Sequence, residues 1–354
     1  MRVTVTARNT SETESRPASR RARAPVVLAT LAVTLLGALL AGVGLGAVSI
    51  PAGDVIAAIA RALSGAEGPI SDNVIIDIRL PRTLLAMLVG ASLATAGVMY
   101  QALFRNPLAD PYILGVSSGA GLGAMIVITL TAGETGLRYL GVPTGAFTGA
   151  ILTIMLVVRL ASLRGRLEVT SLLLAGVAIS FTLAALTSFI MVFSRESMAT
   201  LVFWMMGGLA GASWEYVGML ALMLGFGLLL PMTHSRALNV MLLGDERAAH
   251  LGVDVERFKR LVLASASFLT AGAVAVSGLI GFVGLMTPHA VRLVLGPDHR
   301  LLVPASVLAG AIVMVVADLL ARIVLAPVEI PVGIVTALAG GPFFLWLLVK
   351  GRRL

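Results

Sequence analysis

Long apolar runs separated by short polar segments dominate the amino-acid sequence. Most of these runs reach the ~20 residues that an α-helix needs to cross ~30 Å of hydrocarbon, and alternating segments of β-barrel length do not occur. We therefore predict an all-α polytopic membrane protein with about ten transmembrane helices. The predicted spans lie near residues 26–48, 82–103, 113–132, 143–163, 170–193, 214–232, 258–279, 284–296, 303–323 and 333–349.

Composition supports this fold class. Hydrophobic residues make up 58% of the chain and charged residues 12%, whereas soluble domains are about one quarter charged. The run 26–48 is too long for the apolar core of a signal peptide, so we interpret it as a retained first span. The eighth span, 284–296, is short and contains Pro288, so its ends are the least defined. The chain has no cysteine, which excludes disulfides and thiol chemistry.

The basic residues are distributed unevenly. Residues 1–24 are rich in Arg, Ser and Thr and predict a disordered basic tail, followed by one transmembrane domain over 25–354. With this tail in the cytoplasm, most of the 26 Lys and Arg residues fall on the cytoplasmic side. We expect a multi-pass protein of the plasma or inner membrane with both termini cytoplasmic. The net charge of +8 then reflects topology and does not indicate nucleic-acid binding.

Two similar heptapeptides suggest an internal repeat. The stretch "ASLATAG" at Ala91–Gly97 and the stretch "ASFLTAG" at Ala266–Gly272 share five of seven positions. In the predicted topology they lie in spans of opposite direction, and each leads to a segment broken by proline. Inverted repeats of this kind are common in transporters. Chance similarity between two Ala/Gly-rich helices is the alternative.

The sequence contains no ATP-binding motif of its own. A P-loop requires a lysine in the frame G-x-x-x-x-G-K-[ST], and neither Lys259 nor Lys350 stands in one. The stretch "GVSSG" at Gly115–Gly119 fits the pattern of serine hydrolases, but it opens a predicted span and has no base nearby. Small residues at such a place favour close helix packing. We therefore predict no catalytic residue.

Metal ligation and proton coupling are also disfavoured. Asp318 is the one acidic residue well inside a predicted span, and Arg322 follows one turn later, so a mutually neutralising pair is expected. A proton-coupled carrier usually contains more intramembrane acids. We predict neither a metal site nor a cofactor, because the histidines lack ligand spacing. These are His234, His250, His289 and His299.

A polar segment, Met241–Arg260, separates two long apolar runs. We predict Asp245 as the N-cap of a short helix and Gly252 as the glycine that ends it. Asp254 is then a second N-cap, which starts the helix of the next span. A solvated connector is the alternative, but a connector between helices needs only ~2–8 residues. The length and the caps favour a docking surface.

Several stretches together resemble one transporter family. They are "RLPRTLLAMLVGASLATAGVMYQALFRNPLADPYILGVSSGAGLGA", "LLLAGVAI", "WMMGGL", "LLGDERAAHLGV", "GLIGFVGLMTPHAVRLVLGPDHRLLVPAS" and "VEIPVGIVTALAGGPFFLWLLVK". From about Ile50 to the C-terminus, the chain resembles the permease subunits of the iron-siderophore, haem and cobalamin ABC importers, which are type II importers of the FecCD type. This resemblance implies a cobalamin-permease-like bundle and a dimer with a second permease copy or a paralogue. It also implies two cytoplasmic ATP-binding subunits and an extracytoplasmic substrate-binding protein.

The resemblance assigns roles on the cytoplasmic side. The segment at about 241–257 matches the family's coupling helices, which contact the ATP-binding subunit. The implied cytoplasmic gate lies at Asn106 and Leu108 and at Thr170 and Ser171, although the second pair departs slightly from the family's pattern. The coupling residues are Leu243, Gly244, Asp245, Glu246, Arg247, Ala248, Leu251 and Gly252.

Three arginines have an implied role on the outer side. Pro81 suits the first position of a helix, which would place Arg79 and Arg82 at the positive end of a helix dipole, where a cation is unfavourable. The resemblance implies that these two and Arg322 form a basic pocket for an acidic residue from each lobe of the binding protein. Arginines that extend to the membrane interface are the alternative.

The expected function is that of a permease subunit that imports an iron-siderophore chelate, driven by ATP hydrolysis on separate subunits. Haem and cobalamin are alternative cargoes by the same mechanism. A secondary carrier is disfavoured by the scarcity of intramembrane acids, and an intramembrane hydrolase by the missing base. Membrane lipid is the remaining expected partner.

Overall fold

A computed structural model describes residues 11–46, 48–131, 135–162 and 167–351. Within these ranges the chain is helical and contains no strand, which confirms the predicted fold class. Seven helices of the described part are long and apolar enough to cross a membrane, and three shorter apolar helices accompany them. The membrane helices are α1 (Ser11–Gly44), α4 (Leu80–Leu103), α5 (Val116–Leu130), α6 (Thr135–Ala161), α7 (Val169–Phe193), α9 (Trp214–Thr233), α12 (Val255–Ser277), α13 (Val283–Leu295), α14 (His299–Ile323) and α15 (Val332–Gly351).

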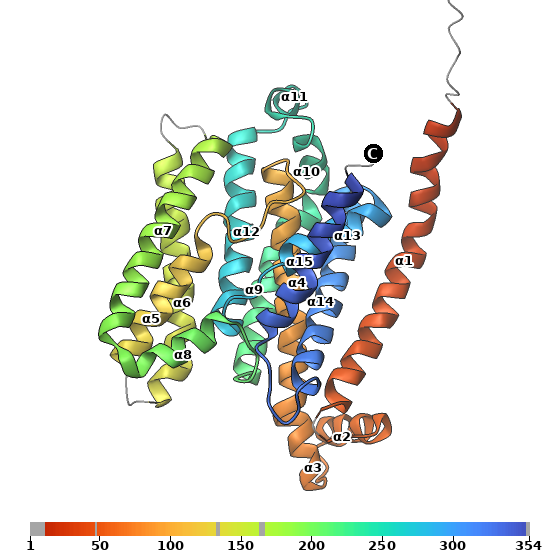
Figure 1. Ribbon diagram of the computed structural model, residues 1–354. Coiled ribbons are helices and arrows are strands. Elements are labelled where there is room, and N and C mark those ends of the chain that lie inside the picture. The colour runs from red at the N-terminus through yellow and green to blue at the C-terminus, as the bar shows by residue number, and fades with distance from the viewer. Residues whose placement is uncertain (1–10, 47, 132–134, 163–166, 352–354) are drawn as a thin grey trace, which may run out of the picture.

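Shorter helices lie between these spans. The pattern of apolar runs did not predict α2 (Ala52–Ser64), α3 (Ile70–Asn73) or α8 (Arg195–Met205). The segment expected to form a docking surface contains α10 (Ser235–Met241) and α11 (Asp245–His250). We call the end of the bundle that carries α10 and α11 the α11 end, and the opposite end, which carries α2 and α3, the α2 end. They lie at the top and the bottom of Figure 1.

Helix α1 differs from the expectation of a disordered tail over residues 1–24. It begins at Ser11 and continues without a break into the first span. A helix that is already nucleated by an apolar span extends at little cost through residues such as Glu, Arg and Ala. Residues 1–10 lie outside the described part of the chain.

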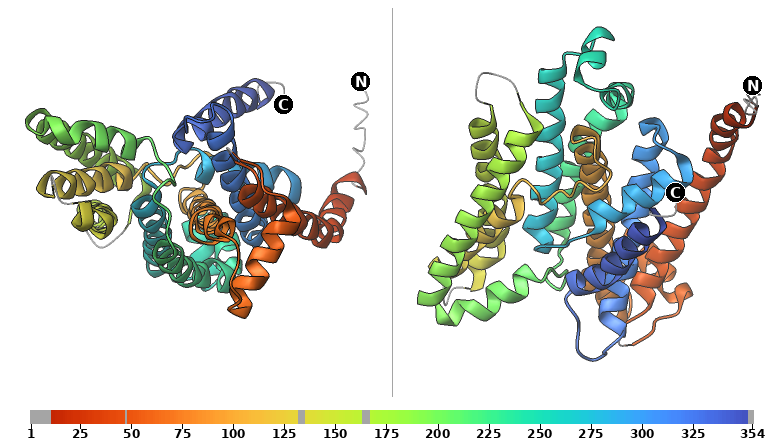
Figure 2. Two further views of the ribbon diagram at one scale, coloured as in Figure 1. Left: turned by 90° about the horizontal axis from the view of Figure 1, so that it is seen from below. Right: turned by 45° about the horizontal axis from the view of Figure 1, so that its top comes forward.

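Helix α4 occupies the centre of the bundle. It packs against α9, α12, α13 and α14, while α5, α6 and α7 lie on one side of it and α1 on the other (Figures 1 and 2). Close packing depends on glycines: Gly90 faces Gly310 of α14, and Gly97 faces Gly284 of α13. At both crossings a Cβ atom would overlap the backbone carbonyl of the other helix. The two predicted repeat heptapeptides lie in α4 and α12, which run in opposite directions.

We expect Gly97→Ala to lower the free energy of unfolding by ~1–3 kcal/mol, because the added methyl group overpacks a backbone contact that cannot yield. Thermal denaturation of the detergent-solubilised protein measures this change. Gly121→Ala is the matched control, since nothing lies within 4 Å of a Cβ atom built at Gly121. Equal denaturation temperatures for the two variants would contradict the expectation.

The continuous helix that contains Pro81 starts well before this residue. The helical backbone starts at Ile70 and runs through a π-helical segment, η1 (Val74–Arg79), into α4, so Pro81 lies inside one continuous helix. In a π-helix each N–H donates to the carbonyl five residues earlier, and proline has no N–H. The Ile76 carbonyl oxygen, which stands five residues before Pro81, instead accepts a hydrogen bond from Trp214 Nε1 at 3.1 Å. The wider turn thus accommodates the proline.

Candidate functional sites

The polar segment at the α11 end has the two-helix form that the sequence predicts. Gly252, with a φ of +84°, ends α11, and its N–H donates to the Ala249 carbonyl at 2.9 Å. Asp254 Oδ1 accepts a hydrogen bond from the Arg257 N–H at 3.2 Å, which confirms its role as the N-cap of α12. The predicted cap of α11 is wrong by one residue, because Gly244 takes that position.

Gly244 has a φ of +101°, a conformation that favours glycine, and Asp245 is therefore the first residue of α11. Its carboxylate does not cap the helix and instead pairs with Lys259 of α12. An acidic residue in the first turn is favourable with the helix dipole even without a capping bond.

The surface of the α11 end combines exposed apolar and charged side chains. Leu243 is 51% exposed and Leu251 is 61% exposed. Glu246 and Arg247 are also exposed, whereas Ala248 is fully buried inside the chain. Ala248 therefore packs α11 against the rest of the chain and does not belong to the surface that a partner reaches. Exposed leucines next to charges are typical of a protein-binding surface.

The segments that carry the predicted gate residues lie at the same end. Asn106 Oδ1 accepts a hydrogen bond from the Leu108 N–H at 2.9 Å, and the Leu108 side chain is 49% exposed. Thr170 is exposed, and Ser171 Oγ donates to Glu168 Oε2 at 3.2 Å. Among the described residues, no hydrogen bond or ion pair joins the first pair to the second. Asn106 and Leu108 lie in one hydrogen-bonded turn, whereas Thr170 and Ser171 lie in the first turn of α7.

One anchor of the α4–α5 segment could not be seen in the sequence. The Tyr112 hydroxyl donates to the Ile280 carbonyl at 3.0 Å and accepts from the Ile280 N–H at 3.1 Å. Asp110 Oδ1 accepts from the Tyr112 N–H at 2.7 Å and fixes the turn. The segment is thus attached to the α12–α13 connection, so the gate residues do not lie on a free loop.

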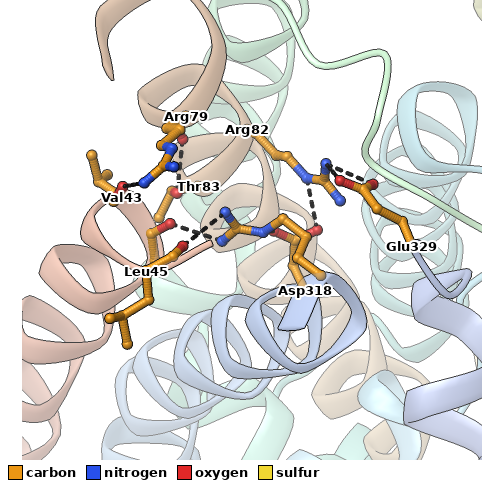
Figure 3. Close-up of polar contacts among 9 residues, drawn as sticks. Val43, Leu45, Arg79, Arg82, Thr83, Asp318 and Glu329 are labelled. Atoms are coloured by element: carbon orange, nitrogen blue, oxygen red, sulfur yellow. Dashed lines mark hydrogen bonds and ion pairs between the residues drawn. The ribbon is translucent and has the colours of Figure 1, made fainter. Parts of the chain in front are cut away.

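At the α2 end, Arg79 and Arg322 bind the end of α1. Figure 3 shows the Arg79 side chain directed at Val43. The last carbonyls of a helix have no partner within the helix and favour cations. Both guanidinium groups therefore occupy a favourable position, which corrects the expected dipole argument for Arg79. The accepting carbonyls are those of Gly42 and Leu45 for Arg322, at 2.8 and 3.3 Å, and those of Val43, Gly44 and Val48 for Arg79, at 3.0, 3.0 and 2.6 Å.

Arg82 binds two acidic residues from distant parts of the chain (Figure 3). Its Nε donates to Asp318 Oδ1 at 3.0 Å, and its Nη1 donates to Glu329 Oε2 at 2.9 Å. Arg322 Nε also pairs with Asp318 Oδ2 at 3.0 Å, which confirms the expected pair within α14. The Asp318 side chain is 1% exposed and the Glu329 side chain 46%. Glu329, which the sequence reasoning missed, is the accessible member of this cluster.

The contacts at the two ends of the bundle are helix caps, turn hydrogen bonds and ion pairs. Among the described residues, no group of three His, Cys, Asp or Glu side chains could hold a metal ion. The Ser117 position lies in the first turn of α5, where Gly119 packs against the backbone of α6.

Comparisons with known proteins find a family and several relatives. The sequence pattern of the FecCD transport family matches residues 33–350. The cobalamin import system permease protein BtuC of Halobacterium salinarum is 47% identical over 77% of this chain and 72% of its own length. The hemin transport system permease protein HmuU of Yersinia pestis is 40% identical over 78% and 84%. A solved inward-facing structure of a metal-chelate type ABC transporter is 34% identical and superposes with a TM-score of 0.81 over 92% of this chain and 99% of that one.

Proposed function

The chain belongs to the FecCD transport family and is a permease subunit of an ABC importer, and from this premise we propose that it carries a bulky metal chelate to the cytoplasm. Like its relatives it is a membrane component of a transporter and not an enzyme. The likeness to a metal-chelate transporter over 92% of the chain supports the proposed cargo class. ATP hydrolysis belongs to separate subunits.

Three cargoes belong to the proposed class. An iron-siderophore chelate is the cargo expected from the sequence, and it stays a prediction. Cobalamin is the second candidate, because the relative with 47% identity is named for cobalamin import. Haem is supported in the same way by the relative with 40% identity.

Uptake into proteoliposomes tests the proposal. The permease is reconstituted with its ATP-binding subunit and its binding protein, and labelled ferric siderophore, cobalamin and haem are offered separately. We expect ATP-dependent accumulation of one class. Accumulation without the ATP-binding subunit, driven by an ion gradient, would instead establish a secondary carrier.

We infer the assembly from the two ends of the bundle. We assign the α11 end to the cytoplasm, where Leu243 and Leu251, the exposed leucines that flank α11, would contact one of the two ATP-binding subunits. The α2 end then faces the substrate-binding protein, and a second permease copy or paralogue completes the translocation path. Helix α1 begins and α15 finishes toward the α11 end (Figure 1), so both chain ends would be cytoplasmic.

For the gate, we expect Leu108→Ala to make the inner mouth leaky. The half-exposed leucine is held in place by the Asn106 turn, and its truncation removes the apolar group that narrows the opening. Efflux of a chelate-sized dye from proteoliposomes without ATP should rise severalfold. Leu130→Ala, at a leucine that is 80% exposed on α5, is the control. Equal efflux from both variants would remove Leu108 from the gate.

For binding-protein docking, the sharpest test is whether Arg82 binds an acidic residue of the binding protein. Glu329 forms an ion pair with Arg82 on the exposed side of the cluster. An acidic residue from a binding protein therefore has to compete with Glu329 for Arg82. Glu329→Gln should raise the association rate with the binding protein severalfold and make it more sensitive to salt. Glu67→Gln removes the same charge from an exposed position at the same end. If both variants associate at the same rate, Arg82 is not the docking group.

A further inference from the structure

Lys259 is a buried cation at the α11 end. Its residue is 4% exposed, and buried lysines are rare unless they are paired. Nζ lies 2.5 Å from Asp245 Oδ2, the first residue of α11, and 4.0 Å from Glu256 Oε1 on its own helix. The ammonium group therefore fastens α11 to α12 through a partly buried ion pair.

The same ammonium group reaches the segment that precedes α7. Lys259 Nζ donates to the Leu167 carbonyl at 3.4 Å, and the Leu167 N–H donates to Glu256 Oε2 at 2.8 Å. Both polar backbone groups of Leu167 are thus held by α12 side chains. Thr170, one of the proposed gate residues, follows three residues later.

The second oxygen of Asp245 faces the other gate segment. Asp245 Oδ1 lies 3.8 Å from Arg105 Nη1, and Arg105 directly precedes Asn106. This separation is an ion pair but is too long for a hydrogen bond. Among the described residues, Asp245 Oδ1 is buried and has no hydrogen-bond partner. Arg105 itself has a φ of +50°, so its backbone is held in a conformation that non-glycine residues rarely adopt.

We infer that Asp245 and Lys259 form a coupling node, which transmits movement of α11 to both segments that carry the gate residues. This inference rests on the proposed function, in which α11 docks on an ATP-binding subunit. One carboxylate joins α11 to Arg105 on one side and, through Lys259, to Leu167 on the other.

The ion pair between Lys259 and Asp245 is costly to separate. Separating Lys259 from Asp245 would leave a buried ammonium group short of a counter-ion, which is strongly unfavourable. The pair therefore stays closed when α11 moves, and the displacement passes to Leu167. The longer Arg105 pair has room to shorten into a hydrogen bond, so it is the arm that changes between conformations.

Lys259→Met tests the node in the assembled complex with the ATP-binding subunit and binding protein. Methionine retains the length and the apolar stem of lysine but removes the charge. We expect assembly and ATP hydrolysis to persist while chelate transported per ATP falls about tenfold, a coupling loss of ordinary size for linked sites. Arg159→Met is the control, because it removes one exposed cation from α6 at the same end.

Distances supply a second readout, since the chain has no cysteine and spin labels can be placed at will. Labels at Ala249 on α11 and at Thr170 should keep one narrow distance distribution with and without ATP in the otherwise wild-type complex. Lys259→Met should broaden that distribution when ATP binds. If Lys259→Met does not assemble, Asp245→Asn replaces it, because this change is isosteric and Asp245 is 43% exposed.

The outcomes separate the node from the function on which it rests. Wild-type transport per ATP in both Lys259→Met and Asp245→Asn would overturn the node and leave the importer intact. A wild-type complex with no ATP-dependent chelate uptake would overturn the proposed function and the node together. Uncoupled hydrolysis in the node variants, with normal coupling in Arg159→Met, would establish the node.

Discussion

Leu251→Arg should abolish ATP-driven uptake while the permease stays folded. Leu251 is 61% exposed at the end of α11, and a contact with an ATP-binding subunit would bury it. Placing a cation in the apolar centre of an interface commonly costs ~2 kcal/mol or more, which corresponds to about thirtyfold in affinity. Affinity for the ATP-binding subunit in detergent and uptake in proteoliposomes measure the effect.

Leu63→Arg is the matched control for this change. Leu63 is 85% exposed on α2, at the opposite end of the bundle, so the same substitution should leave the affinity for the ATP-binding subunit unchanged. An unchanged affinity in Leu251→Arg would contradict docking at α11. A loss in Leu63→Arg alone would reverse the proposed orientation.

Asp318→Asn should strongly destabilise the protein. The Asp318 carboxylate is 1% exposed and balances both Arg82 and Arg322, so its neutralisation leaves two largely buried guanidinium groups short of a counter-charge. Breaking a buried ion pair from one side costs ~3–5 kcal/mol. Thermal denaturation in detergent should show a large drop in the melting temperature.

Glu329→Gln provides the comparison, because Glu329 binds the same Arg82 from the exposed side. Exposed ion pairs contribute only ~0–1 kcal/mol, so this variant should melt close to wild type. Equal drops in melting temperature for the two variants would show that burial does not govern this cluster.

Hydropathy predicted the spans because the bilayer leaves the backbone few choices. A segment inside hydrocarbon has to satisfy its own hydrogen bonds, so each long apolar run becomes a helix. Helix α2 lacks that constraint: Val55 and Ala58 are buried against Val43 and Ile75, while Ile56 on the other face is 57% exposed. To predict α2 from the sequence, one would need the helical period of its apolar residues and the Gly65 cap, because its total hydropathy is not distinctive.

Local chemistry was predictable and distant pairing was not. The Asp254 cap and the Gly252 terminus follow from rules that span a few residues, and both are confirmed. Arg82 and Glu329 are 247 positions apart, so only the packing of α14 against α4 brings them together. The dipole argument failed for the same reason, since nothing near Pro81 reveals that the helix begins at Ile70.

The continuous helix from Ile70 to Leu103 is longer than a bilayer is thick. Its 34 residues give a rod of about 50 Å, against ~30 Å of hydrocarbon. Its first turns therefore extend beyond the hydrocarbon at the α2 end. There, Arg61 Nε forms an ion pair with Asp72 Oδ2 at 2.7 Å. The other end stops two residues before Arg105. One continuous helix thus connects the α2 end of the bundle with the segment that carries Arg105, whose guanidinium group lies 3.8 Å from Asp245 Oδ1.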